Sequence, residues 1–190
     1  MKIVSTNIPD VKIIEPDVFG DARGYFFESW NSAKYASENI DCHWIQDNES
    51  CSTYGVLRGL HYQAAPYTQA KLVRAISGRV LDVAVDIRKN SPTFGLHVAV
   101  ELSGENKRQL FIPRGFAHGF AVLSESAVFA YKCDNSYCPA AERGIAFNDP
   151  DLKIDWQLDL SQVILSAKDL RNPLFKDAEF FDFNSKDYLS

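Results

Sequence analysis

The chain has 190 residues, a length typical of one domain, and its content of 46% hydrophobic and 13% aromatic residues excludes an intrinsically disordered protein. Its formal net charge of −5 opposes binding to nucleic acid and to anionic membrane surfaces, so an anionic ligand would need a local cluster of basic side chains. The N-terminus lacks the apolar run of a signal peptide, and no stretch approaches the roughly 18 apolar residues of a membrane span. We therefore expect a soluble, cytoplasmic protein without nucleic-acid or membrane partners, folded as a single domain over residues 1–190.

The first predicted element is a short helix over residues 31–39, with Asn31 or Ser32 as its N-cap. From about residue 43 to 133 the pattern predicts short strands, because turn signals recur at regular intervals. The signals lie at Gly55, 64–67, Gly78, 90–92, 104–106, 113–115 and 124–126. Such spacing is typical of an all-β sandwich or barrel rather than of alternating strands and helices.

Two of these strands alternate clearly between apolar and polar positions. The segment RVLDVAVDIR, residues 79–88, has apolar residues at alternate positions from Leu81, and Asp82 and Asp86 lie on the opposite face, which reads as polar. HVAVEL, residues 97–102, alternates in the same way. After residue 145 the alternation weakens, and we expect turns and a short helix in a C-terminal segment that packs over the β core from about residue 150. An all-β, double-sheet jelly roll with a few short helices fits this order best.

Four cysteines bear on the compartment: Cys42, Cys51, Cys133 and Cys138. No pair has the CxxC spacing of metal or redox sites, and no secretory signal accompanies them. We predict free thiols in a reducing compartment.

The stretch GVLRGLHYQ, residues 55–63, raises the question of a metal site. Its spacing resembles the first motif of the cupins, which are jelly-roll proteins, with His61 at the position of the first metal-binding histidine. Gln63 stands where the cupins have a second histidine, and Lys71 stands where they have a glutamate. The second cupin motif is present as PRGFAH, which ends at His118. A protonated lysine has no lone pair and repels a dication, so we predict no metal.

A metal-free cavity with these residues suits proton transfer. An imidazole with a pKa of about 6.5 accepts a proton at neutral pH. A lysine beside it stabilises an oxyanion. A set of basic residues is available to hold a phosphorylated ligand: Arg23, Arg58, Arg74, Arg114, Lys168 and Arg171. This combination indicates abstraction of a proton next to a carbonyl group in an anionic substrate.

The base needs an orienting carboxylate, and epimerisation needs an acid on the opposite face. Asp169 is one candidate partner, although Ser166-x-x-Asp169 also fits a helix capping box, and Asp82 and Asp86 are alternatives. Tyr131 lies on an apolar strand, where it is either structural or an acid. His118 lies in a turn flanked by glycines, with a structural or a functional role. The residues alone leave these alternatives open.

Several longer motifs resemble the dTDP-4-dehydrorhamnose 3,5-epimerase family: VLRGLHYQ, QAKLVRAISGRVLDVAVDIR, SPTFG, IPRGFAHGF and YKCDNSYCPAAERGI, followed by NDP and SAKD. The resemblance extends from about Arg23 to Phe183. It implies a metal-free cupin-type jelly roll and a homodimer that acts on a dTDP-linked 4-keto-6-deoxy sugar. The implied reaction inverts C3 and C5 on the way to dTDP-L-rhamnose, and because it involves no oxidation it implies no cofactor.

The resemblance also implies roles for individual residues. His61 is the implied base, Asp169 polarises it, Lys71 stabilises the enolate at C4, and Tyr131 is the acid. Tyr137 is the implied aromatic that stacks on thymine. The remaining implied contacts with nucleotide or sugar are Arg23, Glu28, Gln46, Asn48, Arg58, His118, Glu142 and Lys168.

Three other hypotheses remain at this point. The chain either inverts both centres or, like some relatives, only C3 or C5. A metal-dependent cupin enzyme and a sugar-nucleotide binding module without catalysis are the alternatives from other classes. The N-terminal strand around residues 2–14 is a candidate for exchange between subunits.

Overall fold

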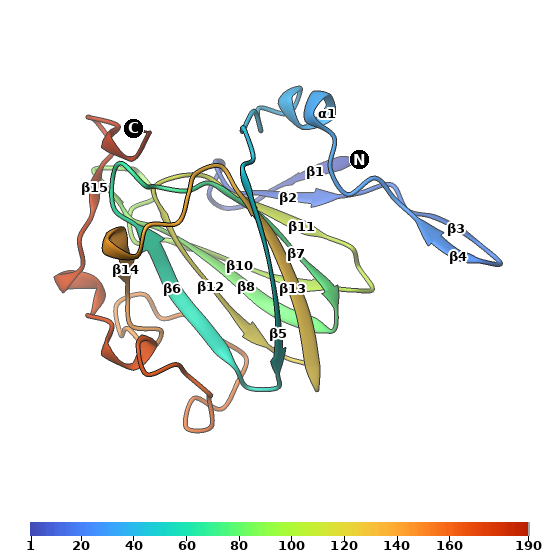
Figure 1. Ribbon diagram of the computed structural model, residues 1–190. Helices are drawn as coiled ribbons and strands as arrows, with labels where there is room; N and C mark the ends of the chain where they lie inside the picture. The colour runs from blue at the N-terminus through green and yellow to red at the C-terminus, as the bar shows by residue number, and fades with distance from the viewer. Residues whose placement is uncertain (190) are drawn as a thin grey trace.

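The computed structural model describes residues 1–189, and two antiparallel sheets packed face to face form its body (Figure 1). The larger sheet has the strand order β1-β2-β11-β7-β13-β5, with β1 (Lys2–Ser5), β2 (Lys12–Glu15), β11 (Gln109–Ile112), β7 (Lys71–Ser77), β13 (Ser126–Cys133) and β5 (Gln46–Thr53). The smaller has the order β10-β8-β12-β6-β14, with β10 (His97–Ser103), β8 (Arg79–Asp86), β12 (Phe116–Val122), β6 (Leu57–Gln63) and β14 (Glu142–Gly144). The predicted cupin-type jelly roll is confirmed, and the turn signals lie between strands except for Ser126, which is the first residue of β13.

The remaining elements are short. They are the hairpin strands β3 (Phe19–Asp21) and β4 (Gly24–Phe26), the helix α1 (Ser32–Ala36), the parallel pair β9 (Arg88–Lys89) and β15 (Phe181–Asp182), and the 3₁₀ helices η1 (Pro139–Ala141), η2 (Asp169–Arg171), η3 (Phe175–Asp177) and η4 (Asp187–Leu189). The side chain of Asn31 accepts a hydrogen bond from the backbone of Lys34, so the predicted helix and its cap are confirmed. No helix in residues 1–189 is long and apolar enough to cross a membrane.

The space between the sheets is filled by the inward residues of both. Val98, Val100 and Leu102 of β10 are buried, as the alternation predicts. Phe120 of β12 and Phe129 of β13 stack with ring centroids 4.2 Å apart, and this pair joins the two sheets at the centre of the core.

A second core lies on the other face of β8. Leu81, Val83 and Val85 pack there against the C-terminal segment, including Trp156, whose indole N–H donates to the carbonyl of Phe147 at 2.8 Å. Strand β8 is thus covered on both faces, because the C-terminal segment closes the outer face of the smaller sheet. The prediction that Asp82 and Asp86 lie on a solvated polar face is wrong, since both are fully buried.

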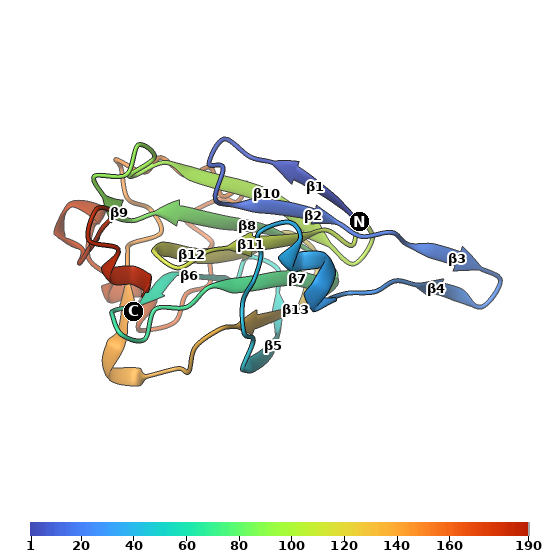
Figure 2. The same ribbon diagram turned by 90° about the horizontal axis from the view of Figure 1, so that it is seen from above.

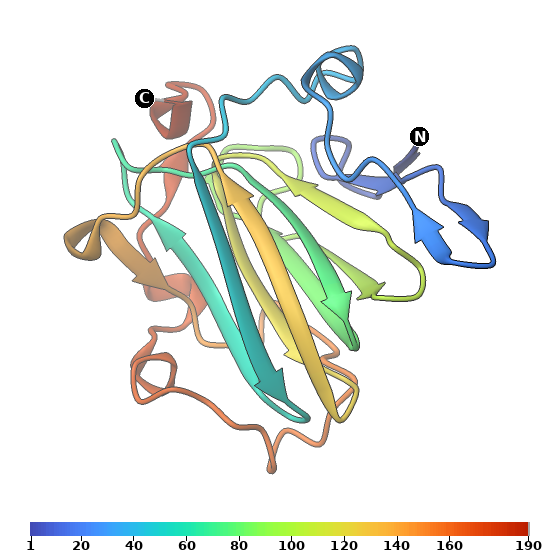
Figure 3. The same ribbon diagram turned by 45° about the vertical axis from the view of Figure 1, so that its right-hand side comes forward.

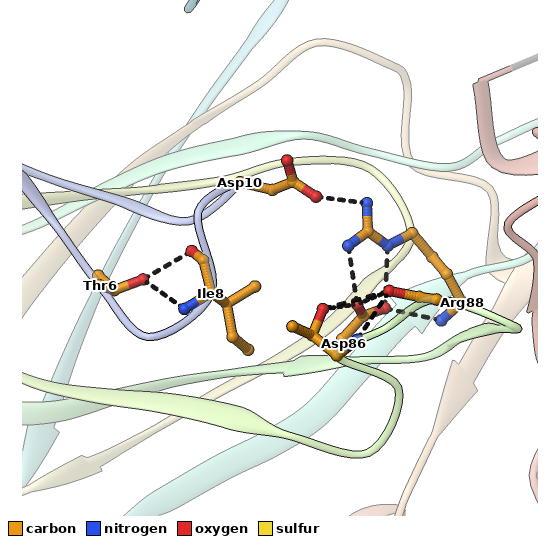
Figure 4. A network of polar contacts seen from close by, with 7 residues as sticks. Thr6, Ile8, Asp10, Asp86 and Arg88 are labelled. Atoms are coloured by element: carbon orange, nitrogen blue, oxygen red, sulfur yellow. Dashed lines mark hydrogen bonds and ion pairs between the residues drawn. The ribbon is translucent and has the colours of Figure 1, made fainter.

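Asp86 is satisfied by a buried network around Arg88 (Figure 4). The Arg88 backbone N–H and Nε donate to one carboxylate oxygen at 2.9 Å, and Nη2 donates to the other at 2.7 Å. Ser91 and Thr93 also donate to Asp86, at 2.7 and 2.6 Å. Nη1 of Arg88 reaches Asp10 at 2.8 Å, so the network ties the N-terminal loop to the end of β8.

The N-terminal region contains two features that the sequence pattern does not separate. Residues 2–14 form a hairpin, in which β1 pairs with β2 and β2 pairs with β11 of the same chain, instead of one continuous strand. The β3–β4 hairpin then projects away from both sheets (Figures 1 and 2). Its aromatic residues Phe19, Tyr25 and Phe26 are exposed.

Candidate active site

A cavity of about 510 Å³ lies between the two sheets. Its walls come from strands of both sheets, and residues 164–169 of the C-terminal segment cross the lower ends of β5 and β6 (Figure 3). The backbone of Ile164 pairs with both Gly55 and Leu57, which anchors this segment beside β6. The cavity collects the candidate residues Asn48, Arg58, His61, Lys71, His118, Tyr131 and Asp169.

His61 and Asp169 form a hydrogen-bonded pair in this cavity. The Nε2 atom of His61 contacts Oδ1 of Asp169, and the His61 side chain keeps 30% of its surface exposed while Asp169 keeps 3%. The hydroxyl of Ser166 donates to the second carboxylate oxygen at 2.9 Å and accepts from the Asp169 backbone N–H at 3.1 Å. Ser166 and Asp169 therefore make local hydrogen bonds of the Ser-x-x-Asp pattern without a complete capping box, and Asp169 pairs with His61 as well. Each of its carboxylate oxygens serves one of the two contacts.

The carboxylate of Asp169 is held in its charged form. Burial acts to raise its pKa, but the hydrogen bond and charge of His61 and the hydrogen bond of Ser166 outweigh burial and lower the pKa below its usual value. A permanent carboxylate fixes the imidazole tautomer, because Nε2 must donate to it and the other ring nitrogen retains its lone pair. The arrangement leaves His61 with one ring nitrogen able to accept a proton.

Lys71 and Tyr131 come from the larger sheet and face the same cavity. The ammonium of Lys71 lies 5.9 Å from the ring centre of Tyr131, and burial lowers its pKa. Burial raises the pKa of Tyr131, so its hydroxyl keeps its proton well beyond neutral pH. The cavity therefore brings an imidazole from one sheet together with a lysine and a protonated phenol from the other.

His118 belongs to the floor of the cavity. It lies inside β12, opposite His61 in the strand register, and not in the turn that its flanking glycines suggest. Its Nε2 atom contacts Asp82 at 2.9 Å. Burial lowers the pKa of His118 despite the opposing effect of Asp82, so the imidazole is neutral at pH 7.

Polar and aromatic candidates gather at the mouth. The Glu142 carboxylate accepts from the Tyr137 hydroxyl and contacts Nζ of Lys168. Gln46 donates to Asn48 at 2.9 Å and accepts from the backbone of Tyr137. These contacts keep the half-exposed ring of Tyr137 next to a cation. The ring is available to stack on a nucleobase, and the cation is available to bind a phosphate.

Gln63 positions the loop that carries Tyr137. Its amide donates to the carbonyls of Tyr67 at 2.8 Å and of Ser136 at 3.1 Å, and it accepts from the Cys138 backbone at 2.7 Å. The residue that replaces a cupin metal ligand thus anchors a loop. The sequence identifies this position but carries no signal for its new role.

Comparison with known proteins is consistent with this geometry. The family model for dTDP-4-dehydrorhamnose 3,5-epimerase matches residues 5–177. The chain belongs to this family. It is 55% identical over 183 residues to the dTDP-4-dehydrorhamnose 3,5-epimerase of Shigella flexneri, covering 95% of this chain and 99% of the relative. A crystal structure of a dTDP-6-deoxy-D-glucose-3,5-epimerase from Legionella pneumophila, in complex with dTDP-4-keto-L-rhamnose, is 51% identical with a TM-score of 0.92, covering 96% of this chain and 98% of that one. A 3′-monoepimerase of Streptomyces bikiniensis in complex with dTDP-quinovose is 30% identical with a TM-score of 0.88, covering 95% and 93%.

Two candidates for contacts in this epimerase family lie away from the cavity of their own chain. Arg23 is at the tip of the β3–β4 hairpin, where it pairs with Asp21 and is 90% exposed. Glu28 follows the hairpin and pairs with Lys34 of α1 at 2.9 Å. The described chain alone therefore does not bring these two residues to His61.

The basic residues divide in a similar way. Arg58 lies in the cavity, where Nε and Nη2 donate to the hydroxyl of Ser52 at 3.2 and 3.0 Å. Arg74 faces the outside of the larger sheet over Phe27, and Arg114 pairs with Asp134 at 2.9 Å. Sequence reasoning missed Ser52, although the alternation that starts at Gln46 and Asn48 would have placed it on the same face of β5.

Proposed function

We propose that this epimerase inverts C3 and C5 of dTDP-4-dehydro-6-deoxy-D-glucose to give dTDP-4-dehydro-L-rhamnose. The observation that carries the proposal is the cavity in which His61, held by Asp169, faces Lys71 and Tyr131. Both centres flank the C4 ketone, so one group that stabilises an enolate at C4 serves both steps. No electron leaves the substrate, and the reaction as written requires no redox cofactor.

Each inversion divides into two proton transfers. His61 takes the C–H proton, and the electron pair of that bond moves into the enolate, whose oxygen at C4 lies against Lys71. The Tyr131 hydroxyl then gives its proton to the same carbon from the opposite face, which leaves a phenolate and an imidazolium. Proton exchange with water restores both groups before the ring is presented again.

The residues at the mouth are proposed to hold the nucleotide. Tyr137 stacks on thymine, and the cations Arg58 and Lys168 meet the diphosphate, with Glu142 keeping Tyr137 and Lys168 together. Gln46, Asn48 and His118 contact the nucleotide or sugar further inside. The ligand in the Legionella pneumophila structure, a dTDP-linked 4-keto sugar, supports this assignment.

The homodimer is proposed on the position of Arg23 and Glu28. The projecting hairpin exposes Phe19, Tyr25 and Phe26, which do not pack on a core of their own chain. A second copy of the chain would cover these rings, and Arg23 would reach the cavity of that second copy. Mixing separately purified Arg23→Ala and His61→Ala chains tests this. Activity that returns on subunit exchange shows that Arg23 acts across the dimer, whereas two inactive halves that stay inactive would contradict it.

A cytoplasmic location is part of the proposal. All four cysteines are free, at residues that the structure describes, and free thiols persist in a reducing compartment. Fractionation of cells that express the tagged chain, followed by detection of the tag in each fraction, would check the location. Protein in the periplasm or the medium would contradict it.

Proton NMR of the sugar nucleotide in deuterated water tests the function. Chelator-treated protein should remove the signals of both the C3 and the C5 proton, and His61→Ala should abolish both losses with the fold retained. The matched control is His43→Ala, an exposed histidine outside the cavity. Loss at a single centre would support the second candidate, a monoepimerase like the Streptomyces bikiniensis relative. Binding without exchange would indicate a binding module, and stoichiometric iron, manganese or zinc in the purified protein would contradict the metal-free mechanism.

A further inference from the structure

Asp82 is a buried carboxylate that the proposed mechanism does not use. It lies on the inner face of β8 with Val80 and Ala84, and none of its surface is exposed. Its neighbour in the register of β12 is Phe120, which lines the cavity. Asp82 therefore sits under the cavity floor, one strand beyond His118.

Its two oxygens have different surroundings. One contacts Nε2 of His118 at 2.9 Å, and the other, Oδ1, is buried with no hydrogen-bond partner among residues 1–189. A buried carboxylate oxygen without a partner is costly, and such groups in native proteins have a functional or structural cause. His118 does not balance the charge, because its imidazole is neutral at pH 7.

Lys71 is a partly buried basic group near this carboxylate, and its positive charge also needs to be balanced. It lines the same cavity as His118 and Phe120, and no carboxylate in residues 1–189 makes an ion pair with it. Burial lowers the pKa of Lys71, and the negative charge of Asp82 opposes that effect. Tyr131 of β13, His118 of β12 and His61 of β6 line the cavity with Lys71, and the charges of Cys133 of β13, Glu142 of β14 and Asp82 of β8 act on its pKa. Cys133 is a neutral thiol, because burial raises its pKa to about 11.

Only two of these groups carry negative charge, and they differ in their contacts with other residues. Glu142 is already bonded to Lys168 and Tyr137 at the mouth. Asp82 has a buried oxygen without a hydrogen-bond partner in the part of the chain that the structure describes.

We propose that Asp82 is a positioning residue of the active site, which supplies the fixed negative charge that keeps Lys71 an ammonium ion and holds His118 as the Nε2–H tautomer. The site then contains two imidazole–carboxylate pairs on neighbouring strands, His61–Asp169 and His118–Asp82, with different duties. The first moves protons. The second sets the charge of the group that stabilises the enolate. This inference rests on the proposed role of Lys71.

The test is the pH dependence of turnover in the Asp82→Asn variant. The amide retains the shape and still accepts from His118, but the charge is lost. We expect the alkaline limb of the turnover profile, where Lys71 loses its proton, to move down by about one pH unit, with the Michaelis constant little changed. Asp82→Glu should restore the wild-type limb, and in a Lys71→Met background Asp82→Asn should cause no further shift. Glu101→Gln, which removes a carboxylate on the outer face of β10, is the matched control and should leave the profile unchanged.

The outcomes separate the possible failures. A folded Asp82→Asn variant with the wild-type profile overturns the inference, as does an equal loss of turnover at every pH. If the variant does not fold, the ¹³Cε signal of Lys71 in the wild-type protein, assigned with Lys71→Arg, decides: an ammonium at pH 8 supports the inference and a neutral amine overturns it. Absence of proton exchange by the wild-type protein would instead contradict the proposed function.

Discussion

Replacing Asp86 by asparagine should destabilise the protein substantially, because the change leaves Arg88 buried without its principal partner. Asparagine keeps the size of the side chain, but its amide nitrogen would face Nη2 of Arg88, which is itself only a donor. Breaking a buried ion pair by removing one partner costs about 3–5 kcal/mol. Asp10 still contacts Nη1 at 2.8 Å, so we expect a loss in the free energy of unfolding near the lower end, about 3 kcal/mol.

A chain of this length loses roughly 2–4 °C in Tm for each kcal/mol, so the expected decrease is about 6–12 °C. Urea unfolding at fixed protein concentration measures the free energy, and Glu179→Gln, which breaks an exposed pair with Arg143, is the control with an expected loss below about 1 kcal/mol. A loss below about 1 kcal/mol for Asp86→Asn as well would refute the reasoning.

The effect also has a sign in pH. Burial acts to raise the pKa of Asp86, but the hydrogen bonds from Arg88, Thr93 and Ser91 outweigh burial and lower it. A depressed native pKa stabilises the fold at pH above the unfolded value, about 3.9, and that stabilisation is lost as the pH falls through the native value. The difference between wild type and variant should therefore shrink below about pH 4. A constant difference would contradict the assignment.

Three further changes test other parts of the structure. Tyr131→Phe should lower product formation by about 10²–10⁴-fold, while exchange of the substrate proton with deuterated water persists, because His61 still works on its own face; loss of exchange as well would mean that Tyr131 is not only the acid. Gln63→Leu should raise the Michaelis constant about tenfold with a smaller change in turnover, because the loop of Tyr137 loses hydrogen bonds worth roughly 1.4 kcal/mol, and an unchanged constant in steady-state kinetics would show that the loop is held otherwise. Phe129→Ala should lower the free energy of unfolding by about 3–5 kcal/mol in urea, since the stacked pair with Phe120 is lost, and a small effect would show that the core collapses around the gap.

The strand pattern and many of the residues that line the cavity could be predicted from the sequence, because the strands depend on local spacing and the lining residues belong to recognisable motifs. Alternation in β10 places its valines correctly in the core. The lysine at position 71, where the cupins have a glutamate, can be recognised from the sequence alone. The same alternation failed for Asp82 and Asp86, because period two separates the two faces of a strand but does not say what covers each face. The C-terminal segment, far along the chain, covers the apolar face with Leu81, Val83 and Val85, so the face with Asp82 and Asp86 is the one that points inward to the larger sheet.

Roles that depend on long-range contacts needed the structure. His118 lies between glycines that suggest a turn, yet the neighbouring strands β6 and β8 keep its segment extended. Ser166 and Asp169 satisfy the local Ser-x-x-Asp pattern and the contact with His61 at once, so no local rule could decide between them. For Arg23 the structure of one chain is not enough either, because its proposed partner is another copy of the chain.

The contact between His61 and Asp169 joins positions 108 residues apart, and the later one belongs to a segment outside both sheets. During synthesis, which proceeds from the N-terminus, the strands of both sheets leave the ribosome before Asp169 does. A nascent chain that already has its sandwich still lacks the group that makes its histidine a base. The two sheets alone are therefore not enough for the pair, which also requires the C-terminal segment to dock beside β6.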